Sequence, residues 1–107
     1  ILTIDAEHAA KLMNDYEFYT TVTIPADTYS CVTEDVETVA VMATIVARND
    51  VPEDTIYNFV KAIFDNKDSI AANHAKGELI DLNTAVSGIT IPFHPGAEKY
   101  YKEAGAL

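Results

Sequence analysis

The sequence predicts an α/β fold in which strands and one helix come first and a group of helices follows. The uncharged run Thr38–Ala47 has no Gly or Pro and is rich in β-branched residues, which favours a strand. Residues 18–24 show the alternation of a second extended segment, which Pro25 ends. The apolar residues of 56–64 recur instead at i, i+3, i+4 and i+7, the period of a helix.

The run Thr38–Ala47 is apolar on both faces if it is extended. Such a strand needs cover on both faces, so we expect a buried central strand. Periodicity alone does not exclude a short core helix at this position. The run is far shorter than the roughly 20 residues of a membrane-spanning helix.

The first part begins with a candidate strand, Ile1–Ile4. No Met and no leader precede it, so we expect the chain to be an excised part of a longer protein. Asp5 is placed to cap a helix over 6–14. The segment 26–35 is polar and is expected to form a loop.

The second part begins after Arg48. Asp50 and Glu53 have the spacing of a capping box, and Pro52 suits a first helical turn, so the helix that contains 56–64 should begin here. Three further helices are expected: 68–76 ended by Gly77, 82–87 begun by Asp81, and a last helix from Pro95 to Gly105.

The length of 107 residues is enough for one domain of ordinary size, and the 49% of hydrophobic residues are enough for a core. The net charge of −10 argues against nucleic acids and anionic membranes as partners, because both are bound through Lys and Arg. Cys31 is the only cysteine, so neither an intrachain disulfide nor a Cys-based metal site can form. Cys31 is interpreted as a small packing residue rather than as a reactive thiol.

The three histidines carry no metal-ligand spacing. For His8 and His74 no other His, Cys or close acid pair completes a ligand set. His94 precedes Pro95 at the start of the last helix, where its imidazole is expected to cap a backbone N–H. General acid/base chemistry and ligand contact are the alternatives for His94, and an anion site at 95–97 would have no basic partner nearby in the sequence.

No nucleophile motif, P-loop or dinucleotide fingerprint occurs, so we expect no catalytic residues, no cofactor and no metal. Three acids at positions 34, 35 and 37 suggest either a solvated loop or, alternatively, acid/base or Ca²⁺ chemistry. Three tyrosines precede the run Thr38–Ala47. Tyr16 is expected in the core, whereas Tyr19 and Tyr29 suit either packing or the lining of a small-molecule cleft.

Several stretches of the chain resemble the C-terminal end of the TAXI-family solute receptors, the extracytoplasmic binding proteins of TRAP transporters. One is Ile91-Pro92-Phe93-His94-Pro95-Gly96-Ala97-Glu98-Lys99-Tyr100-Tyr101, in which His94-Pro95-Gly96-Ala97 is the most specific part. Others are Tyr29–Val41, Ile56-Tyr57 and Glu103-Ala104-Gly105. The pattern departs from the family at Ser30-Cys31, where members commonly carry a small residue or Gly in a tight turn.

The resemblance implies a C-terminal fragment of a two-lobed, type II periplasmic binding-protein fold. Residues 1–37 would end the second lobe, 38–47 would form a crossover or hinge strand, and 48–107 would pack as helices on the first lobe. It also implies a periplasmic location, TRAP membrane subunits as partners, and a small organic anion such as glutamate, glutamine or a dicarboxylate as ligand. No family ligand residue matches directly. By their position beside the crossover, Tyr29 and Thr38, and then Tyr19, are the candidate ligand-binding residues.

Two other classes of function compete with a solute receptor. A freestanding α/β enzyme or small-molecule-binding domain would use His94 and the acids at 34, 35 and 37. A freestanding interaction module would fold alone with a closed core. The fragment interpretation predicts instead that the isolated chain exposes apolar surface, which dimerisation or exchange of elements would cover.

Overall fold

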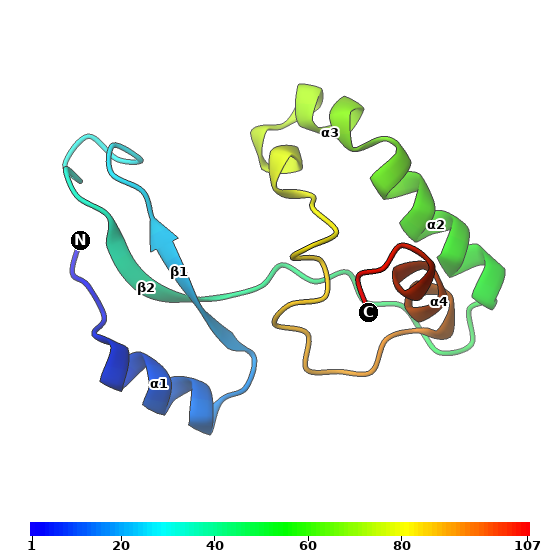
Figure 1. Cartoon of the computed structure of the whole chain (residues 1–107), viewed down its shortest axis with the longest axis horizontal. Helices are drawn as coiled ribbons and strands as arrows, with labels where there is room; N and C mark the ends of the chain where they lie inside the picture. Colours follow the sequence, from blue (N-terminus) through cyan, green and yellow to red (C-terminus); the bar gives the residue numbers. More distant parts are fainter. The chain divides into compact units, whose positions relative to one another are not determined.

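The computed structural model describes residues 1–107, and Figure 1 labels the helices and strands in chain order. The mixture of helices and strands agrees with the predicted α/β class. The elements are α1 (Ala6–Asp15), β1 (Tyr19–Ile24), β2 (Val36–Val41), α2 (Glu53–Asp65), α3 (Lys67–Asn73), the 3₁₀ helix η1 (Ala75–Leu79) and α4 (Pro95–Glu103).

The chain divides into two compact units. Unit 1 consists of Ile1–Thr44 and Gly88–Thr90, and unit 2 consists of Ile45–Ser87 and Ile91–Leu107. The helix α1 and both strands belong to unit 1, and the other helices belong to unit 2. None of the helices combines the length and the apolar character that crossing a bilayer requires.

Asp5 begins α1 as predicted. Its carboxylate accepts a hydrogen bond of 3.0 Å from the backbone N–H of His8, which would otherwise have no partner at the start of the helix. This hydrogen bond lowers the pKa of Asp5, because it stabilises the charged form of the carboxyl group. The next turn of α1 places Ala9 among the few buried residues of unit 1.

β1 and β2 form an antiparallel two-stranded sheet in which Tyr19 lies opposite Val41 and Ile24 lies opposite Val36. Opposed residues share a face, so the even-numbered residues of both strands lie on one face and the odd-numbered residues on the other. The even face is the more buried one, and Val36 belongs to the core. Beside β2, the predicted strand Ile1–Ile4 does not form, because its only hydrogen bond to β2 joins Ile4 N to Glu37 O.

The predicted strand over Thr38–Ala47 is only partly formed. β2 includes residues 38–41, whereas 42–47 have no regular structure, so the alternative of a core helix is wrong. The expected burial is also wrong, since Ile45 and Val46 are 72% and 71% exposed. The physical reason is that β1 has six residues and pairs with 36–41, which leaves no partner strand for the rest of the run.

α2 begins at Glu53 after Pro52, as predicted, but the capping box does not form. Both carboxylate oxygens of Asp50 are taken by the guanidinium of Arg48, with Nε at 2.9 Å and Nη2 at 2.7 Å. The N-cap position of α2 is occupied by Pro52, which has no side-chain acceptor, so α2 has no side-chain cap. The contact with Arg48 lowers the pKa of Asp50.

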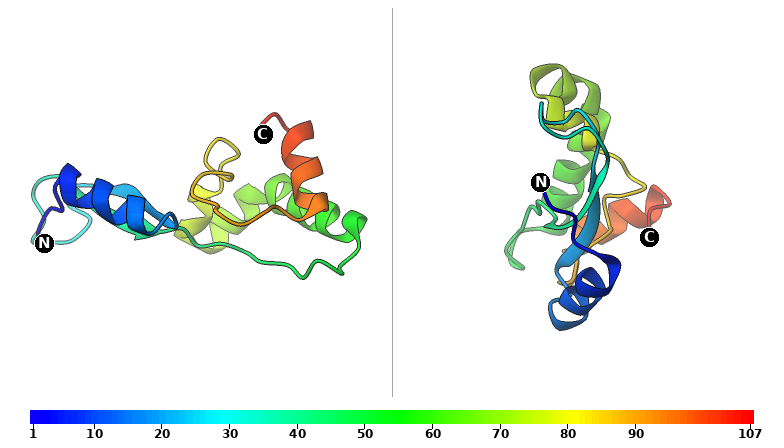
Figure 2. Two further views of the ribbon diagram at one scale, coloured as in Figure 1. Left: turned by 90° about the horizontal axis from the view of Figure 1, so that it is seen from below. Right: turned by 90° about the vertical axis from the view of Figure 1, so that its left-hand side faces the viewer.

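Aromatic rings join α2 to α4, which lie side by side in Figures 1 and 2. Phe64 stacks on Tyr100 with ring centroids 5.6 Å apart, and it meets the edge of Tyr101 at 6.2 Å. The rings of Phe93 and Tyr101 meet edge to face, with their centroids 5.6 Å apart. With the buried Val60, these rings form the core of unit 2, and their burial raises the pKa of Tyr101.

Two of the predicted helices differ from the structure. α3 ends at Asn73, and Gly77 lies inside η1 rather than at a helix end. Glycine is needed there because an added Cβ would lie 2.5 Å from the backbone N of Ala71. The predicted helix over 82–87 is a series of turns, since the Asp81 carboxylate accepts from Asn83 N and so forms an Asx turn.

The turns end at Gly88, which has a φ of 71°. This is the left-handed region that glycine adopts without strain. A Cβ at Gly88 would lie 2.9 Å from Cγ of Met42, so Gly88–Thr90 approaches the chain just beyond β2, within unit 1.

Candidate functional site

Two of the three candidate ligand residues lie in the sheet of unit 1. Tyr19 is the first residue of β1 and lies on the odd face, opposite Val41. Thr38 lies in β2 on the even face, opposite Val22. Both side chains are half-buried, but they project from opposite faces of the sheet.

The third candidate, Tyr29, lies in the loop between the strands and is exposed. The loop is well organised: Tyr29 O accepts from Val32 N at 2.9 Å, and Asp27 N donates to Val32 O at 2.8 Å. Asp27 has a φ of 63°, a conformation that Asp tolerates better than most residues. Tyr19 is the first residue of β1, whereas Tyr29 lies in the loop beyond Ile24, the last residue of the strand. The structure therefore does not bring the three candidates into one cluster.

The acids at positions 34, 35 and 37 do not form a catalytic pair. Asp35 accepts from the backbone N–H of Ala26 at 2.8 Å and thereby closes the loop. Glu37 accepts from the hydroxyl of Thr23 across the sheet at 2.6 Å. No group of three or more His, Cys, Asp or Glu side chains has the arrangement of a metal site. Each acid that makes a contact therefore supports the local structure, and His94, the remaining enzyme candidate, belongs to unit 2.

His94 caps α4 as predicted, and it also joins α4 to the segment before α2. Its Nδ1 accepts from the backbone N–H of Gly96 at 3.2 Å, so the ring proton lies on Nε2. Nε2 then donates to the carbonyl oxygen of Val51 at 3.0 Å. Since both ring nitrogens are occupied, the imidazole has a structural role, as the capping interpretation predicted.

We expect His94→Ala to lower the free energy of unfolding by about 1–2 kcal/mol, because it removes both the cap and the bond to Val51. Urea unfolding followed by the circular dichroism of the helices would measure the loss. His94→Asn restores a capping oxygen but is too short to reach Val51, so its loss should be intermediate. Parental stability in His94→Ala would contradict this role.

Gly96 explains how the two helices approach so closely. It is buried, and an added Cβ would lie 2.2 Å from the carbonyl oxygen of Glu53 and 2.7 Å from the backbone N of Tyr57. The first turn of α4 therefore lies directly against the first turn of α2. The sequence analysis missed this contact; the only signal for it was that glycine occupies the second position of a helix, where a better helix former would be expected.

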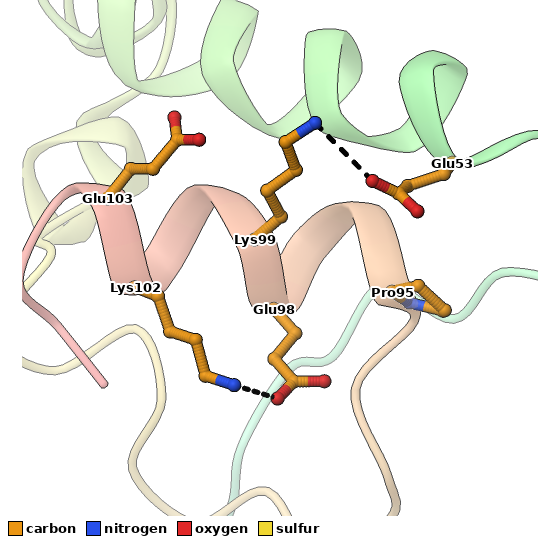
Figure 3. A pocket seen from close by; sticks show the side chains of 6 residues that line it. All are labelled: Glu53, Pro95, Glu98, Lys99, Lys102 and Glu103. Carbon is orange, nitrogen blue, oxygen red and sulfur yellow. Dashed lines mark hydrogen bonds and ion pairs between the residues drawn. The ribbon is translucent and has the colours of Figure 1, made fainter.

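A shallow pocket of about 380 Å³ lies beside this contact, and Figure 3 shows its lining. Six residues line the pocket, and all of them except Glu53 belong to α4. The side chains from α4 point in two directions (Figure 3). Lys99 reaches toward α2, with its Nζ 3.4 Å from Glu53. The lining consists of Glu53, Pro95, Glu98, Lys99, Lys102 and Glu103.

Four of the five charged side chains that line this pocket form ion pairs with one another. Lys102 pairs with Glu98 one helical turn away, and Lys99 pairs with Glu53. The hydroxyl of Tyr57 donates to Glu103 at 2.6 Å, and this bond raises the pKa of Tyr57. The expectation that 95–97 lacks a nearby basic partner is wrong, but both lysines already have carboxylate partners. The pocket therefore has the character of an ion-paired helix surface rather than of an anion site.

A comparison with protein families gives a match to the model of the NMT1-like family over residues 1–105. The chain belongs to the NMT1-like family. This is a family of periplasmic solute-binding proteins related to the binding proteins of TRAP and ABC transporters. The resemblance to a solute receptor is thus confirmed at the level of the class.

Membership in the NMT1-like family bears on three further expectations. It is a family of binding proteins, which agrees with the expectation of a protein without catalytic activity. Its members bind ligands and act with transporter partners in general, and they are typically extracytoplasmic.

Proposed function

We propose that the chain is the C-terminal part of an extracytoplasmic receptor of a TRAP transporter, of the TAXI family. In this proposal the receptor captures a small organic anion between two lobes in the periplasm and delivers it to the TRAP membrane subunits. Glutamate, glutamine or a dicarboxylate would be the solute. Membership in the NMT1-like family supports the class of protein. The resemblance of Ile91–Tyr101 to TAXI receptors supports the finer assignment.

The proposal rests on the position at which the chain passes from one compact unit to the other. The first passage falls between Thr44 and Ile45, inside the run Thr38–Ala47. This position supports a crossover over 38–47 that ends one lobe and leads into helices of another. In the proposal, 1–37 belongs to the second lobe and 48–107 packs on the first lobe.

Exposed apolar residues within the proposed crossover give further support. Val41, Ile45 and Val46 are all exposed, although a run of uncharged, β-branched residues is typical of a protein interior. In the receptor, strands and helices of both lobes would cover these residues. We expect the isolated chain to cover them by forming a dimer, and sedimentation or light scattering would detect that dimer.

Tyr29 and Thr38, and then Tyr19, remain the proposed ligand-binding residues. We expect Thr38→Ala and Tyr29→Phe in the complete receptor each to weaken solute binding without lowering the melting temperature of the unliganded protein. Loss of one hydrogen bond to a charged ligand corresponds to about 1.5–3 kcal/mol, or roughly 10- to 100-fold in Kd. Calorimetric titration of both variants would measure this change. Unchanged affinity in both would place the site on other residues.

A thermal-shift screen of the complete receptor against amino acids and dicarboxylates tests the proposal most directly. A ligand at 100 times its Kd should stabilise the folded protein by about 2.7 kcal/mol, which is readily seen as a rise in melting temperature. No stabilisation by any of these compounds, together with turnover of a related substrate, would favour the enzyme alternative instead.

A further inference from the structure

Three aromatic rings gather at the turn between α1 and β1. The backbone of this turn is blue in Figure 1. The centroids of Phe18 and Tyr19 are 4.9 Å apart. The ring of Tyr16 lies 5.9 Å from Phe18 and 6.4 Å from Tyr19. The backbone fixes this arrangement, because Tyr19 N donates to Tyr16 O at 3.1 Å and closes the turn.

These rings are not used as core. Tyr16 is 52% exposed and Phe18 is 45% exposed, whereas Tyr16 was expected to be buried. The side chains of Tyr16 and Phe18 are therefore accessible to a ligand. The face of an aromatic ring carries partial negative charge, so the group it attracts best is a cation.

Two further features make the same turn electronegative. Asp15 and Glu17 flank Tyr16, and neither carboxylate has a hydrogen bond or an ion pair within the chain, although Lys11 lies one helical turn before Asp15. The turn also follows the C-terminus of α1, where the helix dipole is negative, and the last turn of α1 contains no basic residue. The aromatic faces, the carboxylates and the helix end all belong to residues 15–19, and each of them favours positive charge at this turn.

We propose that this turn, with Tyr16, Phe18 and Tyr19 as its aromatic surface and Asp15 and Glu17 as its charges, binds an organic ammonium group. The ammonium would lie against the ring faces with the carboxylates beside it. If the proposed function holds and Tyr19 contacts the solute, the ammonium is that of an amino acid, and dicarboxylates would not be recognised here. If Tyr19 does not contact the solute, the turn is a separate site for an organic cation.

The test is a titration of the chain with tetramethylammonium chloride against sodium chloride at equal ionic strength, followed by the ring resonances of Phe and Tyr. We expect saturable shifts with tetramethylammonium only. An exposed cation–π contact contributes about 0.5–1 kcal/mol, so Phe18→Leu should raise the Kd roughly two- to fivefold. Glu17→Gln should raise it as well. Phe59→Leu is the matched control, because Phe59 is 47% exposed but belongs to unit 2, and it should leave the Kd unchanged.

The outcomes separate this proposal from the proposed function. Equal shifts with sodium, or equal losses in Phe18→Leu and Phe59→Leu, would overturn the cation site whatever the receptor binds. In the complete receptor, binding of glutamate or glutamine that weakens in Phe18→Leu identifies the ammonium as that of the solute. If Phe18→Leu weakens the binding of tetramethylammonium but not that of glutamate or glutamine, the turn is a separate cation site. Binding of dicarboxylates without any response to tetramethylammonium would leave the receptor function standing and reject the cation site.

Discussion

Gly96→Ala adds a single methyl group, and we expect it to destabilise the fold more than the same change at Gly105. Its Cβ would lie 2.2 Å from a backbone carbonyl oxygen of α2, so the two helices must move apart. Alanine gains at most about 1 kcal/mol of helix propensity over glycine. Overpacking against a rigid backbone costs about 1–3 kcal/mol, and here the helix contact and the bond from His94 to Val51 are disturbed together. We expect a net loss of roughly 2–3 kcal/mol.

Thermal or urea unfolding of Gly96→Ala measures this loss, and Gly105→Ala is the matched control. A Cβ at Gly105 would meet nothing within 4 Å, so Gly105→Ala is destabilised only by the strain of alanine at a φ of 75°. This strain costs roughly 1–2 kcal/mol. The expected order is therefore a larger loss at Gly96 than at Gly105. The reverse order would mean that α4 does not lie against α2 as described.

Phe64→Ala is expected to destabilise unit 2 by about 2–3 kcal/mol. The ring of Phe64 stacks on Tyr100 and meets the edge of Tyr101, so its removal leaves a gap at the centre of the aromatic core. Phe→Ala in a full core costs about 3–5 kcal/mol, and the half-buried position of Phe64 lowers that figure.

Phe59→Ala provides the control on the same helix. Phe59 is 47% exposed and has no aromatic partner, so its removal should cost less than about 1 kcal/mol. Urea unfolding followed by circular dichroism would compare the two variants. Equal losses would indicate that the rings of α2 and α4 do not form the core of unit 2.

The sequence predicted the elements whose signals are local. Asp5 caps α1, Pro52 and Pro95 begin α2 and α4, and His94 caps α4. In each case the decisive group lies within three residues of the helix end, so the sequence contains the whole interaction. The amphipathic pattern of α2 was equally clear because one face recurs over several turns.

The failures share a different cause. The extent and burial of the run Thr38–Ala47 depend on partners that are distant in sequence, and only residues 36–41 find one. The pattern offered Asp50 as the cap of α2, but Pro52 occupies the N-cap position and Asp50 binds Arg48 instead. The close contact at Gly96 was likewise not visible in the sequence, because the clash is with Glu53 and Tyr57, which lie about 40 residues earlier.

The candidate site was less predictable than the fold. The class of protein followed from the resemblance and was confirmed by the NMT1-like family. The positions of Tyr19, Tyr29 and Thr38 on a face or in a loop depend on strand register, which one-residue shifts would reverse. Which of them contacts a ligand remains a prediction.

The short return of the chain at Gly88–Thr90 has a consequence for biosynthesis. These three residues belong to unit 1, but they are made only after most of unit 2. At 5–20 residues per second, the ribosome needs roughly 2 to 9 s to advance from Thr44 to Gly88. During that interval the surface around Met42 is without its partner, so the nascent first unit is open to chaperones and to misfolding until residue 90 has emerged.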